Sequence, residues 1–168
     1  MVPDIQVAIQ HWLARGIGPF YIEEHISPEG VADGAPIHSD LSAAFAYSGD
    51  QQIEVIEQHN DAATIYREYL TRHPEGGLQH LAVWTYDIDA KLEELGDAYI
   101  LRQRYGDMHA YLDCAAAPGV MIQLMANNEI INELFDMIRE GADNWDGVTD
   151  PIRKIDWSTG RPRYPAAS

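Results

Sequence analysis

The stretch Gly76-Gly77-Leu78-Gln79-His80-Leu81-Ala82-Val83-Trp84 decides the fold of this chain, because a glycine corner opens directly into an apolar run. Two successive glycines allow a backbone bend that a residue with a side chain resists. Beyond them Leu81 and Val83 fall on one face and His80 on the other, and this alternation predicts a β-strand. Taken alone, a histidine on such a strand is more often a satisfied core residue than a ligand.

Composition sets the bounds on class and compartment. A chain of 168 residues, 46% of them hydrophobic and 23% charged, is long enough and apolar enough to form a globular core. It contains no apolar run of membrane-spanning length, and its N-terminus lacks the pattern of a signal peptide. The single cysteine, Cys114, excludes an intrachain disulfide and a cysteine-cluster metal site. We therefore expect a cytoplasmic protein that does not act at a membrane.

The net charge of −16 argues against nucleic acid as a partner, because phosphate binding needs a basic surface. The negative excess lies before position 151. The last segment has one acid, Asp156, and four basic residues, which are Arg153, Lys154, Arg161 and Arg163. We expect this basic segment to lie against its own domain or against a neighbouring subunit.

The chain before the glycine corner predicts a helix followed by strands. Asp4 is a suitable N-cap for a helix from Ile5 to Ala14, and Gly16 to Pro19 would end it. The segments that follow are expected to be strands at 20–22, 39–47 and 51–57, a loop or irregular hairpin at 27–36, and a helix from Asp61 to Tyr69.

The same order of elements follows the glycine corner. After the strand that contains His80, Asp87 starts a helix that Gly96 ends. Three further strands are expected at 99–101, 108–113 and 120–125, with a turn at Ala115 to Gly119. The chain is therefore a duplication of a strand, a helix and three strands, in which only Met1-Val2-Pro3 represent the first strand of the first copy.

Residues 127–168 have no counterpart in the duplicated segments. Helical spacing of apolar residues predicts an amphipathic helix from about Asn128 to Glu140 that ends at Gly141. Its apolar face would pack on the outside of its own sheet or on a second subunit. The tail beyond this helix is expected to be held by buried aromatic side chains, those of Trp145, Trp157 and Tyr164.

Short motifs follow one another in a specific order along residues 1–126. They are Val2-Pro3-Asp4-Ile5, Trp12, Gly16-Ile17-Gly18-Pro19-Phe20, Gln52-Ile53-Glu54-Val55-Ile56, Gly77-Leu78-Gln79-His80-Leu81-Ala82, Asp87, Ala110-Tyr111-Leu112-Asp113 and Gly119-Val120-Met121-Ile122-Gln123-Leu124. In this order they resemble the vicinal oxygen chelate superfamily of glyoxalases, bleomycin-resistance proteins and extradiol dioxygenases. The nearest resemblance is to its methylmalonyl-CoA epimerase-like branch.

The resemblance implies an α+β fold. Residues 1–126 would be a single domain of two βαβββ modules, at 1–70 and 77–126, that form a cupped, barrel-like mixed sheet. Residues 127–168 would add a C-terminal helix and an irregular tail.

The resemblance also implies a divalent metal ion, with Glu54, His80 and Gln123 at the ligand positions. Gln123 stands where the family usually has glutamate, and an N-terminal histidine of the family has no counterpart in this sequence. Imidazole and carboxylate suit a divalent ion, and open coordination positions would let a substrate carbonyl bind and stabilise an enolate.

Glu54, His109 and Tyr111 are the candidate catalytic residues. His109 shares a strand face with Tyr111 and would be a ligand or a proton shuttle, as would the carboxylate of Glu54. Tyr111 serves equally well as a polar anchor for substrate or as a packing residue. His59 is expected to be a solvated loop residue, and the histidines expected to be surface or structural residues are His11, His25, His38 and His73.

Two functions follow from these residues. One is a metal-dependent isomerase, epimerase or lyase that acts through an enolate on a small oxygenated or acyl-thioester substrate. The alternative is a metal-free small-molecule binding or resistance-type module that uses the same cup. Glu54 favours the enzyme, because a carboxylate inside a closed cup is costly unless it is paired. The expected partners are a small-molecule substrate and a second copy of the chain in a homodimer.

Overall fold

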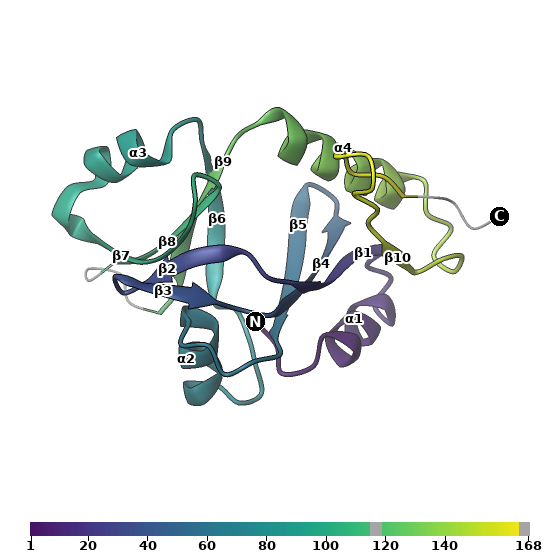
Figure 1. Cartoon of the computed structure of the whole chain (residues 1–168). Coiled ribbons are helices and arrows are strands. Elements are labelled where there is room, and N and C mark those ends of the chain that lie inside the picture. The colour runs from purple at the N-terminus through teal and green to yellow at the C-terminus, as the bar shows by residue number, and fades with distance from the viewer. Residues whose placement is uncertain (115–118, 165–168) are drawn as a thin grey trace. The chain divides into compact units, whose positions relative to one another are not determined.

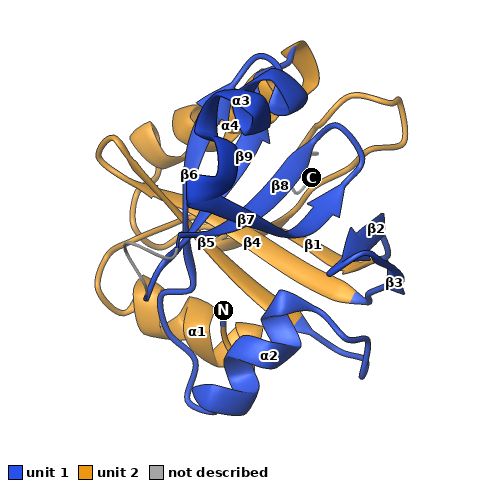
Figure 2. Ribbon diagram, turned by 90° about the vertical axis from the view of Figure 1, so that its left-hand side faces the viewer, with its two compact units in different colours: residues 1, 27–40, 58–128 blue, residues 2–26, 41–57, 129–168 orange. Residues whose placement is uncertain are grey.

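The computed structural model describes residues 1–114 and 119–164, which fall into two compact units (Figure 2). Unit 1 contains residues 1, 27–40 and 58–128, and unit 2 contains residues 2–26, 41–57 and the chain from Glu129 onward. Each unit is discontinuous in sequence and is described by itself. The overall class is α+β with mixed sheets, as expected.

The described part of unit 1 is built on a mixed sheet of six strands in the order β3-β2-β7-β8-β9-β6 (Figure 1). β6 and β9 pair in parallel, and the other neighbours pair antiparallel. The strands are β2 (Glu29–Ala32), β3 (Ala35–His38), β6 (His80–Thr85), β7 (Tyr99–Tyr105), β8 (His109–Cys114) and β9 (Met121–Ala126). The irregular hairpin expected before residue 40 is thus β2 and β3.

Helix α3 (Ile88–Leu95) connects β6 to β7 and completes a βαβββ order. Asp87 caps it by accepting the Ala90 N–H at 2.9 Å, and Gly96 ends it at a φ of 56°, as the sequence predicts. Ile88 packs into an apolar cluster on one face of the sheet, with Ala110, Leu112 and Leu124. The expected turn from Ala115 lies largely outside the described residues.

Helix α2 (Ile65–Arg72) begins later than expected, and the start at Asp61 is wrong. Its N-cap is Thr64, which is buried. The buried side chain of Gln58 explains the shift, because its amide donates to the carbonyl of Ala62 at 2.9 Å and holds the intervening residues in a loop. A side-chain contact of this kind overrides the local helix signal.

The described part of unit 2 is built on a four-stranded mixed sheet in the order β10-β1-β4-β5. β1 pairs in parallel with β10 and antiparallel with β4. The strands are β1 (Phe20–Ile26), β4 (Leu41–Ser48), β5 (Gln51–Gln58) and β10 (Ile152–Lys154).

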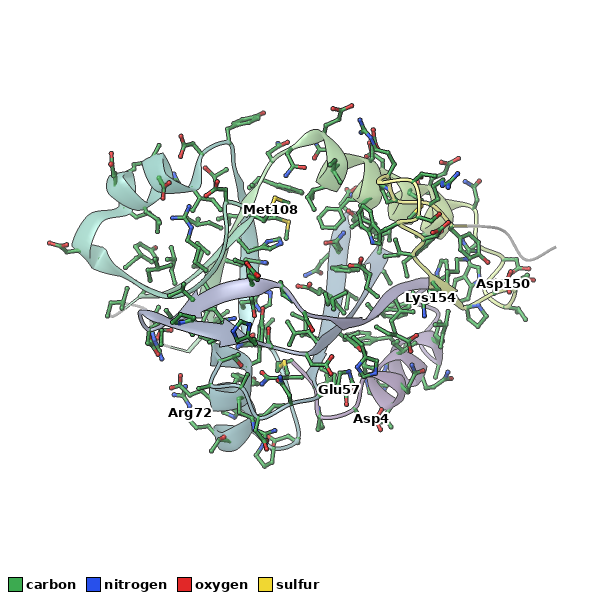
Figure 3. The ribbon with its side chains drawn as sticks, in the orientation of Figure 1. Asp4, Glu57, Arg72, Met108, Asp150 and Lys154 are labelled. Carbon is green, nitrogen blue, oxygen red and sulfur yellow. The ribbon has the colours of Figure 1, made fainter. Side chains whose placement is uncertain are left out.

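Helix α1 (Ile5–Leu13) covers one face of this sheet, where Ile5 and Ile9 are buried against Phe20. Asp4 caps the helix as expected, accepting the Val7 N–H at 2.9 Å. Glu57 accepts the Ile5 N–H at 2.9 Å (Figure 3), so that two carboxylates stabilise the positive end of α1.

The first three residues make strand-like contacts although no strand is assigned there. Val2 N–H donates to the Ile56 carbonyl at 2.9 Å within unit 2. In unit 1 the amine of Met1 donates to the Gly77 carbonyl at 3.0 Å, and the Gly77 N–H donates to the Met1 carbonyl at 2.9 Å. No strand forms at residues 1–3, and their correspondence to the first strand of a duplicated module stays a prediction.

Helix α4 (Glu129–Asp143) passes through Gly141, so the predicted end at this glycine is wrong. Of its two expected partners, its own sheet and a second subunit, the structure shows the helix on its own sheet. Phe135 packs on Phe45 of β4 with ring centroids 5.9 Å apart, on the face opposite α1. Both faces of this sheet are therefore covered from within unit 2.

The basic segment after position 151 lies on its own unit, which was one of the two places expected for it. Trp157 donates its indole N–H to Glu23, and Lys154 pairs with Glu24 at 3.2 Å. Tyr164 packs edge-on against Tyr21 at 5.7 Å. Across residues 1–114 and 119–164, no helix is long and apolar enough to cross a membrane.

We expect Gly141→Ala to destabilise the protein, although alanine is the better helix former. A Cβ at this position would overlap Tyr21 Oη and lie 2.8 Å from Cζ. Tyr21 is only 2% exposed and accepts a hydrogen bond from Arg153 at 2.8 Å, so it has little room to move. Overpacking costs about 1–3 kcal/mol, against a helix-propensity gain of about 1 kcal/mol.

Denaturant unfolding of Gly141→Ala would measure this loss. The double variant with Tyr21→Phe should recover part of it, because the phenol oxygen is removed. A free energy of unfolding above that of the wild type in Gly141→Ala would contradict the assigned contact.

Candidate functional site

The register of the unit 1 sheet collects polar side chains on the face opposite α3. Gln123 pairs with Ala82 of β6 and Tyr111 of β8, and in-register neighbours point to the same side. His80 and His109 fall on this side by alternation along their strands. With buried polar side chains from nearby segments they form what we call the polar cluster, namely Ser39, Tyr66, Gln79, His80, Gln103, Tyr105, His109, Tyr111 and Gln123.

Gln123 lies at the centre of the polar cluster and is 2% exposed. Its amide nitrogen lies 3.0 Å from Tyr111 Oη and 3.3 Å from His109 Nδ1. Among the described residues its Oε1 is a fully buried side-chain atom with no hydrogen-bond partner. Because such an orphaned acceptor costs about 1–3 kcal/mol, it is a natural contact point for a cation or for a donor on a ligand.

Tyr111 joins Gln123 to the rest of the cluster. It is 3% exposed and accepts a hydrogen bond from Tyr66 of α2 at 2.8 Å. The rings of Tyr66 and His80 meet it edge-on, with centroids at 5.8 and 5.3 Å. This edge-to-face packing holds the phenol in one orientation beside His80.

A second part of the cluster contains residues that the sequence did not single out. Tyr105 Oη is 3.1 Å from Ser39 Oγ and accepts a hydrogen bond from Gln103 at 2.9 Å. Burial raises the pKa of Tyr105 despite the bond to Ser39, so its hydroxyl keeps its proton. The alternation of Gln103 and Tyr105 along a strand could have identified them, but the strand expected at 99–101 was too short to include these residues.

Asp113 lies two residues after Tyr111 on β8 and is bound to an arginine. Arg102 pairs with Asp113 at 2.6 Å, with Asp33 at 2.8 Å and with Glu68 at 2.8 Å. Hydrogen bonding to Arg102 lowers the pKa of Asp33. This network ties the β2–β3 hairpin, α2 and β8 together at the side of the polar cluster.

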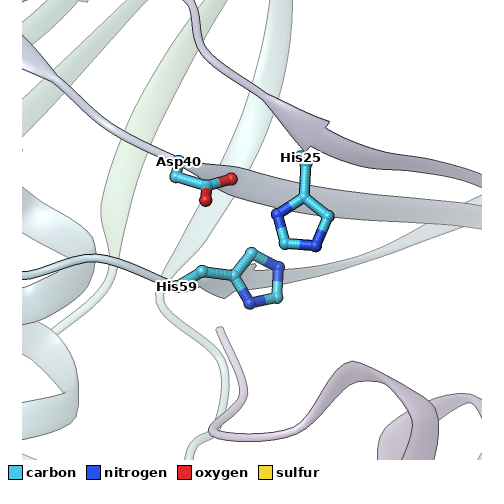
Figure 4. A group of neighbouring side chains, drawn as sticks. All are labelled: His25, Asp40 and His59. Carbon is cyan, nitrogen blue, oxygen red and sulfur yellow. The ribbon is translucent and has the colours of Figure 1, made fainter.

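A separate imidazole and carboxylate pair lies in unit 1 outside the polar cluster. The side chains of Asp40 and His59 offer an oxygen and a nitrogen within 4.8 Å of each other (Figure 4). The main-chain N–H of His59 also donates to the main-chain carbonyl of Asp40 at 2.8 Å. Figure 4 also draws His25, a residue of unit 2. His59 does follow β5 in a loop, but no spacing in the sequence pointed to Asp40 as its neighbour.

Glu54, the third residue expected as a metal ligand, belongs to β5 of unit 2. It acts electrostatically on Glu23 of β1, which the sequence did not single out. Burial raises the pKa of Glu23, the hydrogen bond from Trp157 lowers it, and the charge of Glu54 raises it. Unit 2 therefore brings two carboxylates together.

Two side-chain atoms of the polar cluster are suited to coordinate a divalent cation. Gln123 Oε1 is a buried acceptor without a partner in the part of the chain that the structure describes, and amide oxygen is a hard ligand. Gln79 Oε1 lies 3.1 Å from His80 Nδ1, and in the tautomer that donates this bond His80 Nε2 carries the lone pair. An imidazole nitrogen and an oxygen suit Zn²⁺ and other first-row divalent ions.

A family model described as glyoxalase/bleomycin resistance protein/dioxygenase superfamily matches residues 1–115 of the chain. The match includes Glu54, His80, His109 and Tyr111, and it ends before Gln123. A search of curated proteins finds no match.

Glu23→Gln is expected to raise the melting temperature at neutral pH. Because the pKa of Glu23 is raised in the folded state, its contribution to stability is present below the unfolded value of about 4.3 and is lost as pH rises through the folded value. A neutral amide avoids this loss and can still accept from Trp157.

Melting curves from pH 3 to pH 8 would test this expectation, and the gain should vanish at the acid end. Glu24→Gln is the matched control, since Glu24 is exposed and pairs with Lys154. An equal gain from Glu24→Gln would show that the effect comes from net charge and not from burial.

Proposed function

We propose that this chain, which belongs to the glyoxalase/bleomycin resistance protein/dioxygenase superfamily, is a metal-dependent isomerase, epimerase or lyase that acts through an enolate. The proposed substrate is a small oxygenated or acyl-thioester compound. One observation carries the proposal: on the same sheet face as His80, Gln123 presents a buried oxygen that has no hydrogen-bond partner among residues 1–114 and 119–164.

In this proposal His80 and Gln123 hold the metal ion, and Glu54 is a third ligand on the strength of the resemblance alone. A bound divalent ion would polarise a substrate carbonyl and lower the cost of developing negative charge. His80 and Gln123 are neutral ligands, and a carboxylate ligand would add negative charge that favours a divalent ion.

Tyr111 and His109 are proposed to act on the substrate. The Tyr111 oxygen accepts bonds from Tyr66 and Gln123, so toward a ligand the phenol acts as a donor, which suits a carbonyl or enolate oxygen. His109 accepts from the Gln123 amide at Nδ1, which places its N–H on Nε2 as a proton donor. Glu54 is then the proposed base for the carbon-bound proton.

Within the superfamily, we propose that the chain belongs to the methylmalonyl-CoA epimerase-like branch, because the order of its motifs resembles that branch. An acyl thioester has the carbonyl and the adjacent acidic carbon that this chemistry needs. A cytoplasmic location is likewise a proposal, which rests on the single cysteine, Cys114.

The alternative is a metal-free module that binds a small molecule, and the chemistry of the polar cluster favours it in one respect. Its buried members are neutral side chains, those of Ser39, Tyr66, Gln79, Gln103, Tyr105, Tyr111 and Gln123. Such a surface recognises an uncharged polar ligand by hydrogen bonds and aromatic edges without any metal.

Metal analysis of protein purified without chelator tests the enzyme proposal. A divalent ion is expected in the wild type, and His80→Ala and Gln123→Leu should lose it, because each removes a ligand. Gln123→Glu should bind the ion about tenfold or more tightly, since it adds a charge. His59→Ala is the control, because its imidazole lies beside Asp40 outside the polar cluster.

Deuterium exchange from D₂O at the carbon next to a thioester carbonyl, followed by NMR, reports enolate formation. The exchange should depend on the ion and on His80. Protein that holds no ion and gains no exchange on adding one would exclude the enzyme and leave the binding module. Loss of the ion in His59→Ala but not in His80→Ala would place the metal elsewhere.

A homodimer is a further expectation. In the described residues β6 is an outer strand of the unit 1 sheet, and its Leu81 and Val83 are 49% and 43% exposed. Exposed apolar residues on an edge strand often mark an interface. Sedimentation equilibrium should give twice the chain mass of 18.9 kDa, and a monomer at all concentrations would contradict it.

A further inference from the structure

Gln79 lies between the first turn of α2 and His80. Its side chain is 2% exposed, and its amide nitrogen donates to the carbonyl of Ile65 at 3.0 Å. Its amide oxygen lies 3.1 Å from His80 Nδ1. One side chain thus contacts a main-chain carbonyl at one end and an imidazole at the other.

The chemistry of these contacts defines the orientation of the Gln79 amide. A carbonyl oxygen can only accept a hydrogen bond, so the NH₂ group of Gln79 must face Ile65. The opposite end of the amide is then the oxygen, which can only accept. His80 must therefore donate from Nδ1, and in the neutral ring the lone pair then lies on Nε2.

The Ile65 carbonyl is itself held firmly, because the first turn of α2 is bound to the polar cluster at several points. Gln103 accepts the Ile65 N–H at 3.1 Å. Thr64 caps the helix, and Tyr66 donates to Tyr111 at 2.8 Å. The acceptor that orients Gln79 is therefore a rigid part of the fold.

We propose that Gln79 is a positioning residue that holds His80 in the Nδ1–H tautomer. The carbonyl of Ile65 sets the orientation of the Gln79 amide, and the amide oxygen then accepts the Nδ1–H of His80. The role of His80 as a ligand rests on the proposed function, whereas the tautomer does not. In metal sites the ligating histidine usually donates its other N–H to an acceptor of this kind, which fixes the ring and raises its basicity. Gln79 supplies that acceptor from the position next to His80 in the chain.

Two-bond ¹⁵N–¹H correlation spectra of the metal-free protein would identify the tautomer of His80. The spectra are recorded about two pH units above the ordinary histidine pKa of about 6.5, with His80→Ala used to assign the signals. We expect the proton on Nδ1 in the wild type. A proton on Nε2 in the wild type would overturn the proposal, whatever any variant does.

Gln79→Met removes both amide contacts at similar volume, and it should let His80 populate both tautomers. Tyr66→Phe is the matched control, since it breaks another bond of the same helical turn but leaves Gln79 in place. We expect its His80 tautomer to be unchanged. A pure Nδ1–H tautomer in folded Gln79→Met would overturn the proposal.

Zn²⁺ titration separates this inference from the proposed function. Loss of a partner that orients a ligating histidine weakens metal binding about 10–100-fold, so Gln79→Met should show a loss of that size. If the wild type binds no Zn²⁺ yet shows the Nδ1–H tautomer, the proposed function fails while the positioning role stands. If Zn²⁺ binds through His80 with equal affinity in both proteins, the positioning role fails.

Discussion

The parallel pairing of β6 with β9 is the contact on which the polar cluster depends. It sets Ala82 beside Gln123 and places His80 on the same face, although these residues come from opposite ends of the second βαβββ segment. A parallel pair requires a crossover, and α3 provides it across one side of the sheet. Apolar residues such as Leu112 and Leu124 are buried under that helix, which leaves the opposite face to polar side chains.

A buried polar face is stable only when its atoms are paired, and this requirement explains the contacts around α2. The first turn of the helix supplies main-chain and phenol groups to Gln103, Gln79 and Tyr111. Arg102 holds the same helix from outside the cluster through Glu68. The exception among these paired atoms is Gln123 Oε1, and an exception of this kind is what a ligand site requires.

Unit 2 also contains a mixed sheet, but helices cover both of its faces. Helix α1 covers one face and α4 the other, and the close approach of Gly141 to Tyr21 shows how tightly the second helix packs. The tail adds Trp157 over Glu23. A sheet covered on both sides contributes to stability, and this one also carries the neighbouring carboxylates of Glu23 and Glu54.

Local features were determined by the sequence alone. The caps at Asp4 and Asp87, the strands at β5 and β6, and the βαβββ order after the glycine corner follow from alternation and capping, which neighbouring residues decide. The motif order also identified the superfamily. For the same reason the strand positions of His80, His109, Tyr111 and Gln123 were available before the structure.

Only the tertiary structure decided the contacts between distant segments. The start of α2 depends on Gln58, the close packing of α4 at Gly141 depends on Tyr21, and the pairing of Asp40 with His59 depends on the path of two loops. None of these has a periodic signal, because each is a contact between side chains and main chain that only folding brings together. His80 itself shows the division. Its place on a strand face is a property of the sequence, whereas its hydrogen-bonded tautomer depends on a carbonyl of α2.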